Sequence, residues 1–326
     1  MEISIVVPAR NAARTIGGCL QSLLEQSVSR ERYEVIVVDD GSTDETRQMV
    51  ERSGATLMAQ AQQGPAAARN KGVSVSKGDI VLFTDADCVP EANWVQEMIR
   101  AFEDGEIAGA KGVYRTRQTG IIPRFVQCEY EERYELMAKQ RWIDFIDTYS
   151  AGYRREIFVA EGGFDTRYPS ASVEDQEFSF RLAERGHKMV FNPRAVVYHQ
   201  HPETLTAYFK RKFNIGYWKV MVLRRHPGKA VRDSHTPQTL KIQMGLAVLL
   251  LPLLALLLVR SFFCSLPLLT LVLFLTSALP FTVKALRKDP VVGLFSPILL
   301  FVRALALGLG MVKGGWDAML RRERAN

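Results

Sequence analysis

The sequence contains little cysteine. Its four cysteines, Cys19, Cys88, Cys128 and Cys264, are scattered among 326 residues, and no two of them form a Cys-x-x-Cys pair. This distribution argues against a structural zinc site and against a disulfide framework. It is typical of proteins in a reducing compartment, so we expect the thiols to be reduced.

The sequence also has little that resembles a targeting signal or a repeat. Met1–Pro8 has no basic start, and its apolar run is shorter than that of a secretory signal peptide. No internal repeat and no long low-complexity segment is visible. Because 47% of the residues are hydrophobic, the chain can bury a large core in one domain with an appendage, or in two domains.

Acidic residues are scarce in the C-terminal part only. Residues 202–326 contain 18 Lys and Arg against 5 Asp and Glu, a net charge of +13, whereas residues 1–201 carry a net charge of −6. The acidic N-terminal part argues against a nucleic-acid-binding protein. The basic, apolar C-terminal part indicates contact with a membrane that contains anionic lipids.

Two long apolar runs predict membrane spans. Ile242–Val259 and Phe262–Val283 have 18 and 22 residues, enough to cross a hydrocarbon layer of ~30 Å. Arg260 and Ser261 between them leave room only for a tight helical hairpin. Because Lys284, Arg287 and Lys288 follow the second run, we expect that end, and the N-terminal domain, on the cytoplasmic side of the cell membrane.

A third apolar run, Val291–Val312, contains Pro297 and Arg303. A full crossing would bring Arg303 near the middle of the membrane, at a cost of ~2.5–3.5 kcal/mol. Together with Gly308 and Gly310, this favours a broken, re-entrant or interfacial segment and a cytoplasmic C-terminus. The alternative is a third crossing in which the other helices bury Arg303.

Residues 204–241 predict a basic amphipathic helix and a linker. One face of the helix carries apolar side chains spaced by four and the other carries basic ones, a pattern typical of a helix in the membrane interface. The apolar face consists of Leu205, Phe209, Phe213 and Tyr217, and the basic face of Lys210, Arg211, Lys212 and Lys219. A basic surface helix packed on the N-terminal domain is the alternative.

Strand and helix patterns alternate in residues 1–203, which predicts an α/β domain with a mostly parallel sheet. The expected strands are Ile3–Pro8, Glu34–Val38, Thr56–Ala59, Ile80–Phe83 and Ala195–Tyr198, and the expected helices are Thr15–Gln26, Pro65–Val73 and Gln176–Arg185. In such sheets ligands bind at the carboxyl ends of the strands. Three polar clusters lie there, at Pro8–Asn11, Asp39–Asp44 and Asp85–Asp87.

Asp85 and Asp87 sit at alternate positions after a buried strand. Two carboxylates this close repel each other unless a cation lies between them, and their oxygens suit Mg²⁺ or Mn²⁺. A pair of solvated turn aspartates is the alternative. Asp39 and Asp40, after another strand, are expected either to accept hydrogen bonds from a nucleoside or to lie at the start of a helix, whose cap Ser42, Thr43 or Asp44 could equally supply.

Further polar residues have two interpretations each. Arg69 and Asn70 either contact a nucleotide or pair locally near a helix start. Glu174 and Asp175 precede a helix, where they either suit its dipole or supply a general base. His199 and His201 follow a strand and either complete the metal site or lie on the surface.

Together these motifs resemble the family 2 glycosyltransferases, which have the GT-A fold, over residues 1–201. The matching segments, in order, are Ile5-Val6-Val7-Pro8-Ala9-Arg10-Asn11, Val37-Val38-Asp39-Asp40-Gly41-Ser42-Thr43-Asp44, Ala68-Arg69-Asn70-Lys71-Gly72, Thr84-Asp85-Ala86-Asp87, Ala151-Gly152, Gly162-Gly163-Phe164-Asp165, Glu174-Asp175 with Arg181-Leu182 and Gly186, and Tyr198-His199.

The resemblance implies roles for these residues. It implies a donor site of Pro8, Ala9, Asn11, Asp40, Arg69, Asp85 and Gly152, a catalytic base Asp175 beside Glu174, and a metal site of Asp87 and His199. The implied reaction inverts the anomeric carbon of a UDP- or GDP-linked sugar, with Mg²⁺ or Mn²⁺ stabilising the departing nucleoside diphosphate. The membrane segments suggest a membrane-associated acceptor, such as a lipid-linked one, in cell-surface glycan or glycolipid synthesis.

The chain departs from the processive polysaccharide synthases of that family, because Tyr208–Phe213 replaces their Gln-x-x-Arg-Trp motif. Single-sugar transfer is therefore the prediction, with Arg211 or Lys210 facing the diphosphate, and processive synthesis is the alternative. A nucleotidyltransferase would need a glycine-rich loop that Pro8–Asn11 lacks. A non-catalytic membrane scaffold is the remaining alternative, although competent residues fill every candidate catalytic position.

Overall fold

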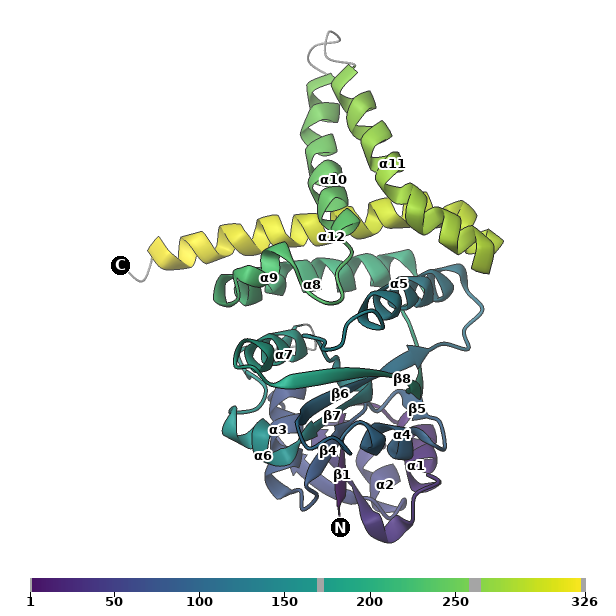
Figure 1. Ribbon diagram of the computed structural model, residues 1–326, viewed down its shortest axis with the longest axis vertical. Coiled ribbons are helices and arrows are strands. Elements are labelled where there is room, and N and C mark those ends of the chain that lie inside the picture. Colours follow the sequence, from purple (N-terminus) through teal and green to yellow (C-terminus); the bar gives the residue numbers. More distant parts are fainter. Residues whose placement is uncertain (1, 169–172, 258–264, 324–326) are drawn as a thin grey trace. The chain divides into compact units, whose positions relative to one another are not determined.

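The computed structural model describes residues 2–168, 173–257 and 265–323 (Figure 1). The chain forms two compact units, which we call the sheet unit and the helical unit. The sheet unit consists of Met1–Arg117, Tyr134–Gln200 and Asp233–His235, and the helical unit of Gln118–Arg133, His201–Arg232 and Thr236–Asn326.

The sheet unit is built on one sheet of mostly parallel strands, in the order β3-β2-β1-β4-β7-β6-β8-β5. The strands are β1 Ile3–Ala9, β2 Tyr33–Asp40, β3 Thr56–Gln60, β4 Ile80–Phe83, β5 Cys88–Pro90, β6 Ile107–Arg115, β7 Ala151–Arg154 and β8 Lys188–His199. The β3-β2-β1-β4 half is parallel throughout, and β7 and β5 pair antiparallel with their neighbours. The predicted α/β class is confirmed.

Helices flank the sheet in Figure 1. They are α1 Ile16–Leu24, α2 Thr46–Glu51, α3 Pro65–Val75, α4 Trp94–Arg100, α6 Arg155–Ala160 and α7 Glu174–Glu184, with short 3₁₀ helices at Arg30–Arg32 and Thr148–Ser150. Since helices cover the sheet, its central strands are apolar along nearly their whole length. Gly72 lets α3 approach β1, because a Cβ there would lie 2.3 Å from Cγ1 of Val6.

Of the three candidate caps for the helix after β2, Ser42 and Thr43 are wrong, and only Asp44 contacts the first residue of the helix. Helix α2 begins at Thr46, whose backbone N–H donates to the Asp44 carboxylate at 3.0 Å. The Ser42 hydroxyl instead accepts a hydrogen bond from the backbone N–H of Asn11 at 2.9 Å. Residues 41–44 therefore link the ends of β1 and β2 instead of starting the helix.

The helical unit contains most of α5 (Ile121–Met137) and five further helices. These are α8 Leu205–Arg225, α9 Gly228–Val231, α10 Gln238–Leu257, α11 Ser265–Lys288 and α12 Pro290–Glu323. Gln238–Leu256, Ser265–Lys288 and Pro290–Leu320 are long and apolar enough to cross a membrane. The hairpin expected at Arg260 and Ser261 lies outside the described residues.

Helices α10 and α11 run side by side, whereas α12 passes across one end of the pair and along α8 (Figure 1). The apolar part of α12 is 56% buried within the protein, against 22% for α10 and 33% for α11. The break expected at Pro297, Gly308 and Gly310 is wrong, since α12 is one continuous helix. Gly310 serves close packing instead, because a Cβ there would lie 2.2 Å from the carbonyl oxygen of Phe213 in α8.

A buried ion cluster holds the helical unit together. It consists of Glu129 in α5, Lys212 in α8, Gln243 in α10 and Arg303 in α12, each at most 6% exposed. Glu129 Oε1 accepts from Lys212 Nζ and from Arg303 Nη1, each at 3.2 Å, and Arg303 Nη2 donates to Gln243 Oε1 at 2.9 Å. Lys212 therefore does not lie on an exposed basic face, because the carboxylate of Glu129 stabilises its charge inside the unit.

We expect Arg303→Ala to destabilise the helical unit, because it leaves Gln243 and part of the Glu129 carboxylate without their buried donor. Breaking a buried ion pair costs about 3 kcal/mol or more. The check is thermal unfolding in detergent. The control is Lys313→Ala, which removes an exposed pair with Asp317 on the same helix and should change stability by less than about 1 kcal/mol. Equal destabilisation by the two variants would contradict a structural role for the cluster.

Candidate active site

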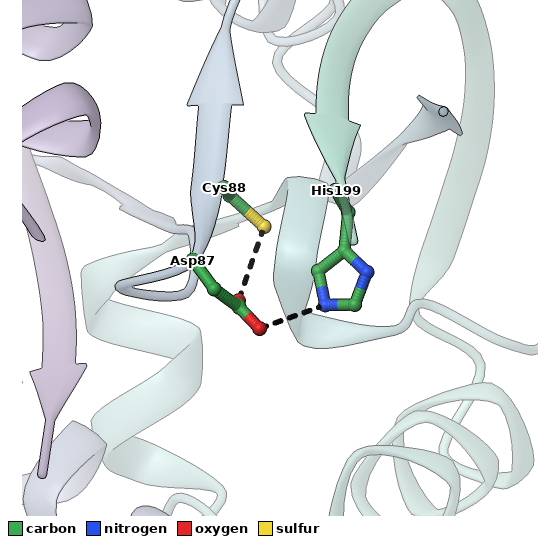
Figure 2. A group of neighbouring side chains, drawn as sticks. All are labelled: Asp87, Cys88 and His199. Atoms are coloured by element: carbon green, nitrogen blue, oxygen red, sulfur yellow. Dashed lines mark hydrogen bonds and ion pairs between the residues drawn. The ribbon is translucent and has the colours of Figure 1, made fainter. Parts of the chain in front are cut away.

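Strand pairing brings Asp87 next to His199. Strand β4 ends at Phe83, and the chain then turns into β5, which pairs antiparallel with β8 so that Cys88 lies opposite His199. The distance from His199 Nε2 to Asp87 Oδ2 is 3.3 Å (Figure 2). Two residues separated by more than a hundred positions thus converge because β5 and β8 share this register.

The side chains of Asp87, Cys88 and His199 form a group that could hold a metal ion. One ligand atom from each lies within 4.8 Å of the others (Figure 2). Carboxylate oxygen suits Mn²⁺ or Mg²⁺, whereas imidazole nitrogen and especially a thiolate are softer ligands. The His199 ring stacks on Tyr114 with centroids 4.8 Å apart, which fixes its plane. The Asp87 side chain is 43% exposed and so accessible to a ligand.

His201 does not belong to this metal-binding group. It is part of the helical unit, where its ring stacks on Tyr130 and its Nε2 lies 3.3 Å from Oε1 of Gln127. Only the first of the two histidines therefore lies beside Asp87.

Arg69 joins two acidic segments that are far apart in the sequence. Its guanidinium donates to Asp85 Oδ1 at 2.6 Å and to Glu174 Oε1 at 3.0 Å, and the Arg69 side chain is only 2% exposed. Arg69 is therefore neither a helix cap nor a partner of nearby residues. Asn70 has a different role, since its side chain pairs with the backbone N–H and carbonyl of Phe164.

Asp175 has the protonation behaviour of a general base near neutral pH. Desolvation by the surrounding protein and, to a lesser extent, the negative charge of Glu174 together raise the pKa of this carboxyl to about 7. Arg69 opposes this increase only in part. Because Asp175 is also partly exposed, a substrate hydroxyl can reach it.

The carboxylates at the end of β2 organise backbone loops. Asp40 is 4% exposed and accepts from Gln60 Nε2 and from the backbone N–H groups of Gln63 and Gly64, each at 2.8 Å. Its neighbour Asp39 accepts from Ser42 and Arg47. A ligand at Asp40 would therefore meet a carboxylate that is already held in place.

The other predicted donor-site residues have varied positions. Pro8 and Ala9 end β1, and Asn11 follows with a positive φ of 49° while its side chain accepts from Thr43 N. Gly152 faces packed side chains, since a Cβ there would lie 2.8 Å from Leu82. Arg211 is exposed on α8 in the helical unit.

Lys111 was missed by the sequence analysis. It lies in β6, is 1% exposed, forms an ion pair with Asp147 and donates to the Tyr149 hydroxyl at 2.8 Å. Its positive charge also helps to lower the pKa of Asp175. The feature of the sequence that could have indicated Lys111 is that it is the one charged residue in the otherwise apolar Ile107–Tyr114.

Comparisons with known proteins find similarity to glycosyltransferases. Probable glycosyltransferase YdaM of Bacillus subtilis (strain 168) is 28% identical over 228 residues, 65% of this chain, and the match spans 53% of YdaM. A Methanococcus voltae protein named dolichyl N-acetyl-alpha-D-glucosaminyl phosphate 3-beta-D-2,3-diacetamido-2,3-dideoxy-beta-D-glucuronosyltransferase is 22% identical, with 68% of this chain and 74% of that protein covered.

The fold is also found in a solved structure. The structure of this chain is similar to that of the mannosyltransferase PcManGT from Pyrobaculum calidifontis in complex with GDP-Man and Mn²⁺. The TM-score is 0.63 and the sequence identity 21%, and the match covers 97% of this chain and 87% of the PcManGT chain. The model of glycosyl transferase family 2 matches residues 4–160. Residues 4–160 therefore form a family 2 glycosyltransferase domain, and the fold is GT-A.

Proposed function

We infer that the protein is an inverting, metal-dependent glycosyltransferase that moves a single sugar from a UDP- or GDP-linked donor to a membrane-associated acceptor. One observation carries this proposal. Asp175, with a pKa raised to about 7, is connected through Glu174 and Arg69 to Asp85, two positions before Asp87 of the metal-binding group. This arrangement offers one base and one metal site, as a direct displacement requires.

The metal would be held by Asp87 and His199. A divalent ion there supplies positive charge that stabilises the diphosphate leaving group. The PcManGT structure contains Mn²⁺ together with GDP-Man, which supports a divalent ion and a nucleotide-sugar donor for this fold. The carboxylate oxygens of Asp87 fit Mn²⁺ or Mg²⁺.

In the proposed reaction Asp175 accepts the proton of an acceptor hydroxyl. The oxygen forms a bond to the anomeric carbon while the bond from that carbon to the diphosphate oxygen breaks, so the configuration inverts. Arg69 holds the side chains of Asp85 and Glu174 in place through two charge-assisted hydrogen bonds, although it carries out no proton transfer itself. Glu174 increases the basicity of Asp175 through its negative charge.

Pro8, Ala9, Asn11, Asp40, Asp85 and Gly152 are proposed to bind the donor. Support comes from the positions of the first five at or just beyond the carboxyl ends of β1, β2 and β4, where α/β sheets bind ligands. Gly152 lies near the start of β7, which is antiparallel to β4, and it pairs with Leu82 close to the same edge of the sheet. At position 152 close packing against Leu82 already requires a glycine, whether or not a donor binds there. The backbone of Gly152 is therefore the part proposed to face the donor.

The acceptor is proposed to be lipid-linked, as part of cell-surface glycan or glycolipid synthesis. The three candidate membrane helices would keep the enzyme at the surface where such acceptors diffuse. The Methanococcus voltae relative is named for transfer to a dolichyl-linked sugar phosphate, which supports this acceptor class. The donor is a cytosolic metabolite, so the proposed location is the cytoplasmic face of the cell membrane.

We expect Asp87→Asn to weaken Mn²⁺ binding by at least roughly 10- to 100-fold, because it removes the anionic ligand. Isothermal titration with Mn²⁺ in the presence of a nucleoside diphosphate measures this. The control is Asp79→Asn at the opposite, amino end of β4, which should bind normally. Unchanged Mn²⁺ affinity in Asp87→Asn would exclude this residue as a ligand.

We expect Asp175→Asn to lower the transfer rate ~10²–10⁴-fold and to leave donor affinity nearly unchanged, because only deprotonation of the acceptor is lost. The control is Glu184→Gln at the other end of α7. In the unmodified protein the rate should increase with pH up to about 7 and then level off, since Asp175 must lose its proton. Glu174→Gln should move the rising part of this pH–rate profile to lower pH, because the charge of Glu174 raises the pKa of Asp175. Parallel losses of rate and donor affinity in Asp175→Asn would place Asp175 in the donor site instead.

The membrane topology is proposed as two spans, α10 and α11, with α12 in the interface and a cytoplasmic C-terminus. A cysteine introduced by Ala325→Cys, after the native cysteines are replaced, should resist an impermeant thiol reagent in intact cells. It should react once the cells are permeabilised, which controls for accessibility. Labelling in intact cells would indicate three crossings.

A further inference from the structure

A short segment that follows α9 packs against the helix that carries Asp175. Asp233–His235 belongs to the sheet unit, although the residues before and after it belong to the helical unit. His235 is 3% exposed, and the side chain of Asp233 is 1% exposed. A polar segment is buried this deeply only when specific partners satisfy it.

Hydrogen bonds and a ring contact hold the segment beside the loop before β7. The backbone N–H of Ser234 donates to Asp144 Oδ1 at 2.9 Å, and the Ser234 hydroxyl accepts from the backbone N–H of Asp144 at 3.1 Å. The imidazole of His235 stacks on Phe145 with ring centroids 4.1 Å apart and an interplanar angle of 26°. These contacts fix both the backbone of the segment and the plane of the His235 ring.

The edge of the His235 ring reaches the first turn of α7. Its Nδ1 lies 3.3 Å from Asp233 Oδ1, and its Nε2 lies 2.9 Å from Gln176 Nε2. In the neutral ring whose proton is on Nδ1, the nitrogen nearer to the Asp233 carboxylate, Nε2 accepts the amide hydrogen of Gln176. The side chains of Asp233, His235 and Gln176 therefore lie next to one another in that order.

Gln176 contacts Asp175 directly. Its backbone N–H donates to Asp175 Oδ1 at 2.7 Å, so the position of residue 176 determines where one carboxylate oxygen points. From the other side, the Ser179 hydroxyl donates to the backbone carbonyl of Asp175 at 2.7 Å. Any movement of the Gln176 side chain away from His235 is therefore transmitted to the carboxylate through one residue.

We propose that His235 is a positioning residue for Asp175, which holds the first turn of α7 through Gln176 so that the carboxylate faces the acceptor. The proposal rests on the inferred role of Asp175 as the base. Only Thr236 and Pro237 separate His235 from α10, the first helix long enough to cross a membrane. The segment that positions the base is thus continuous with the membrane helices.

The test compares full-length His235→Ala, His235→Gln and His235→Asn. The alanine variant should lower kcat about 10- to 100-fold, since small displacements of catalytic groups have effects of that size. The KM for the donor should stay nearly constant. Glutamine places an oxygen near the position of Nε2 and should restore most of the rate, whereas the shorter asparagine should not. His187→Ala is the control, since His187 lies beyond the other end of α7 and pairs with Glu161.

Gln176→Ala gives a second, independent measurement if His235→Ala fails to fold. It should lower kcat to the same extent, and adding His235→Ala should cause no further loss, because both remove one contact. A kcat within twofold of normal in folded His235→Ala would overturn the proposal, as would equal losses in the alanine and glutamine variants. Asp175→Asn, measured in parallel, separates the role of His235 from the role of Asp175. Normal activity of Asp175→Asn would show that Asp175 is not the base.

Discussion

The ionic contact of Arg69 with Asp85 and Glu174 is the interaction on which the site depends. Carboxylates from two loops near the metal-binding group would repel one another without a cation between them. A guanidinium is suited to this position, since it stays ionised and donates to two partners in a fixed plane. Because Arg69 is buried on α3, the packing of that helix on β1 determines where Arg69 holds the side chains of Asp85 and Glu174.

The helical unit uses the same principle in an apolar setting. Glu129 is the shared acceptor of Lys212 and Arg303, so α5, α8 and α12 meet at one buried carboxylate, while Gln243 connects α10. A charged residue in an apolar helix is expensive to bury alone but acceptable when it is paired. Arg303 therefore has a structural partner within the protein, in keeping with a helix that is more than half buried.

Polar contacts of this kind also hold a short segment of the chain that comes just before α10, the first candidate membrane helix. Asp233–His235 lies between α9 and α10 and yet packs with Gln176 in the sheet unit. An apolar segment could fill the same volume, but it would not fix the direction of the Gln176 amide. The buried histidine and aspartate therefore provide orientation, which hydrophobic packing alone does not.

The sequence by itself determined the α/β class, the apolar helices and the carboxylate clusters at strand ends, because these follow from local periodicity and strand–turn–helix order. Tertiary structure alone decided which distant groups meet. The approach of His199 to Asp87 depends on the β5–β8 register, that of Arg69 to Glu174 on helix packing across 105 positions, and that of His235 to Gln176 on a segment returning from the other unit. Such pairings are set by long-range hydrogen bonding and side-chain packing, for which one sequence carries no local pattern.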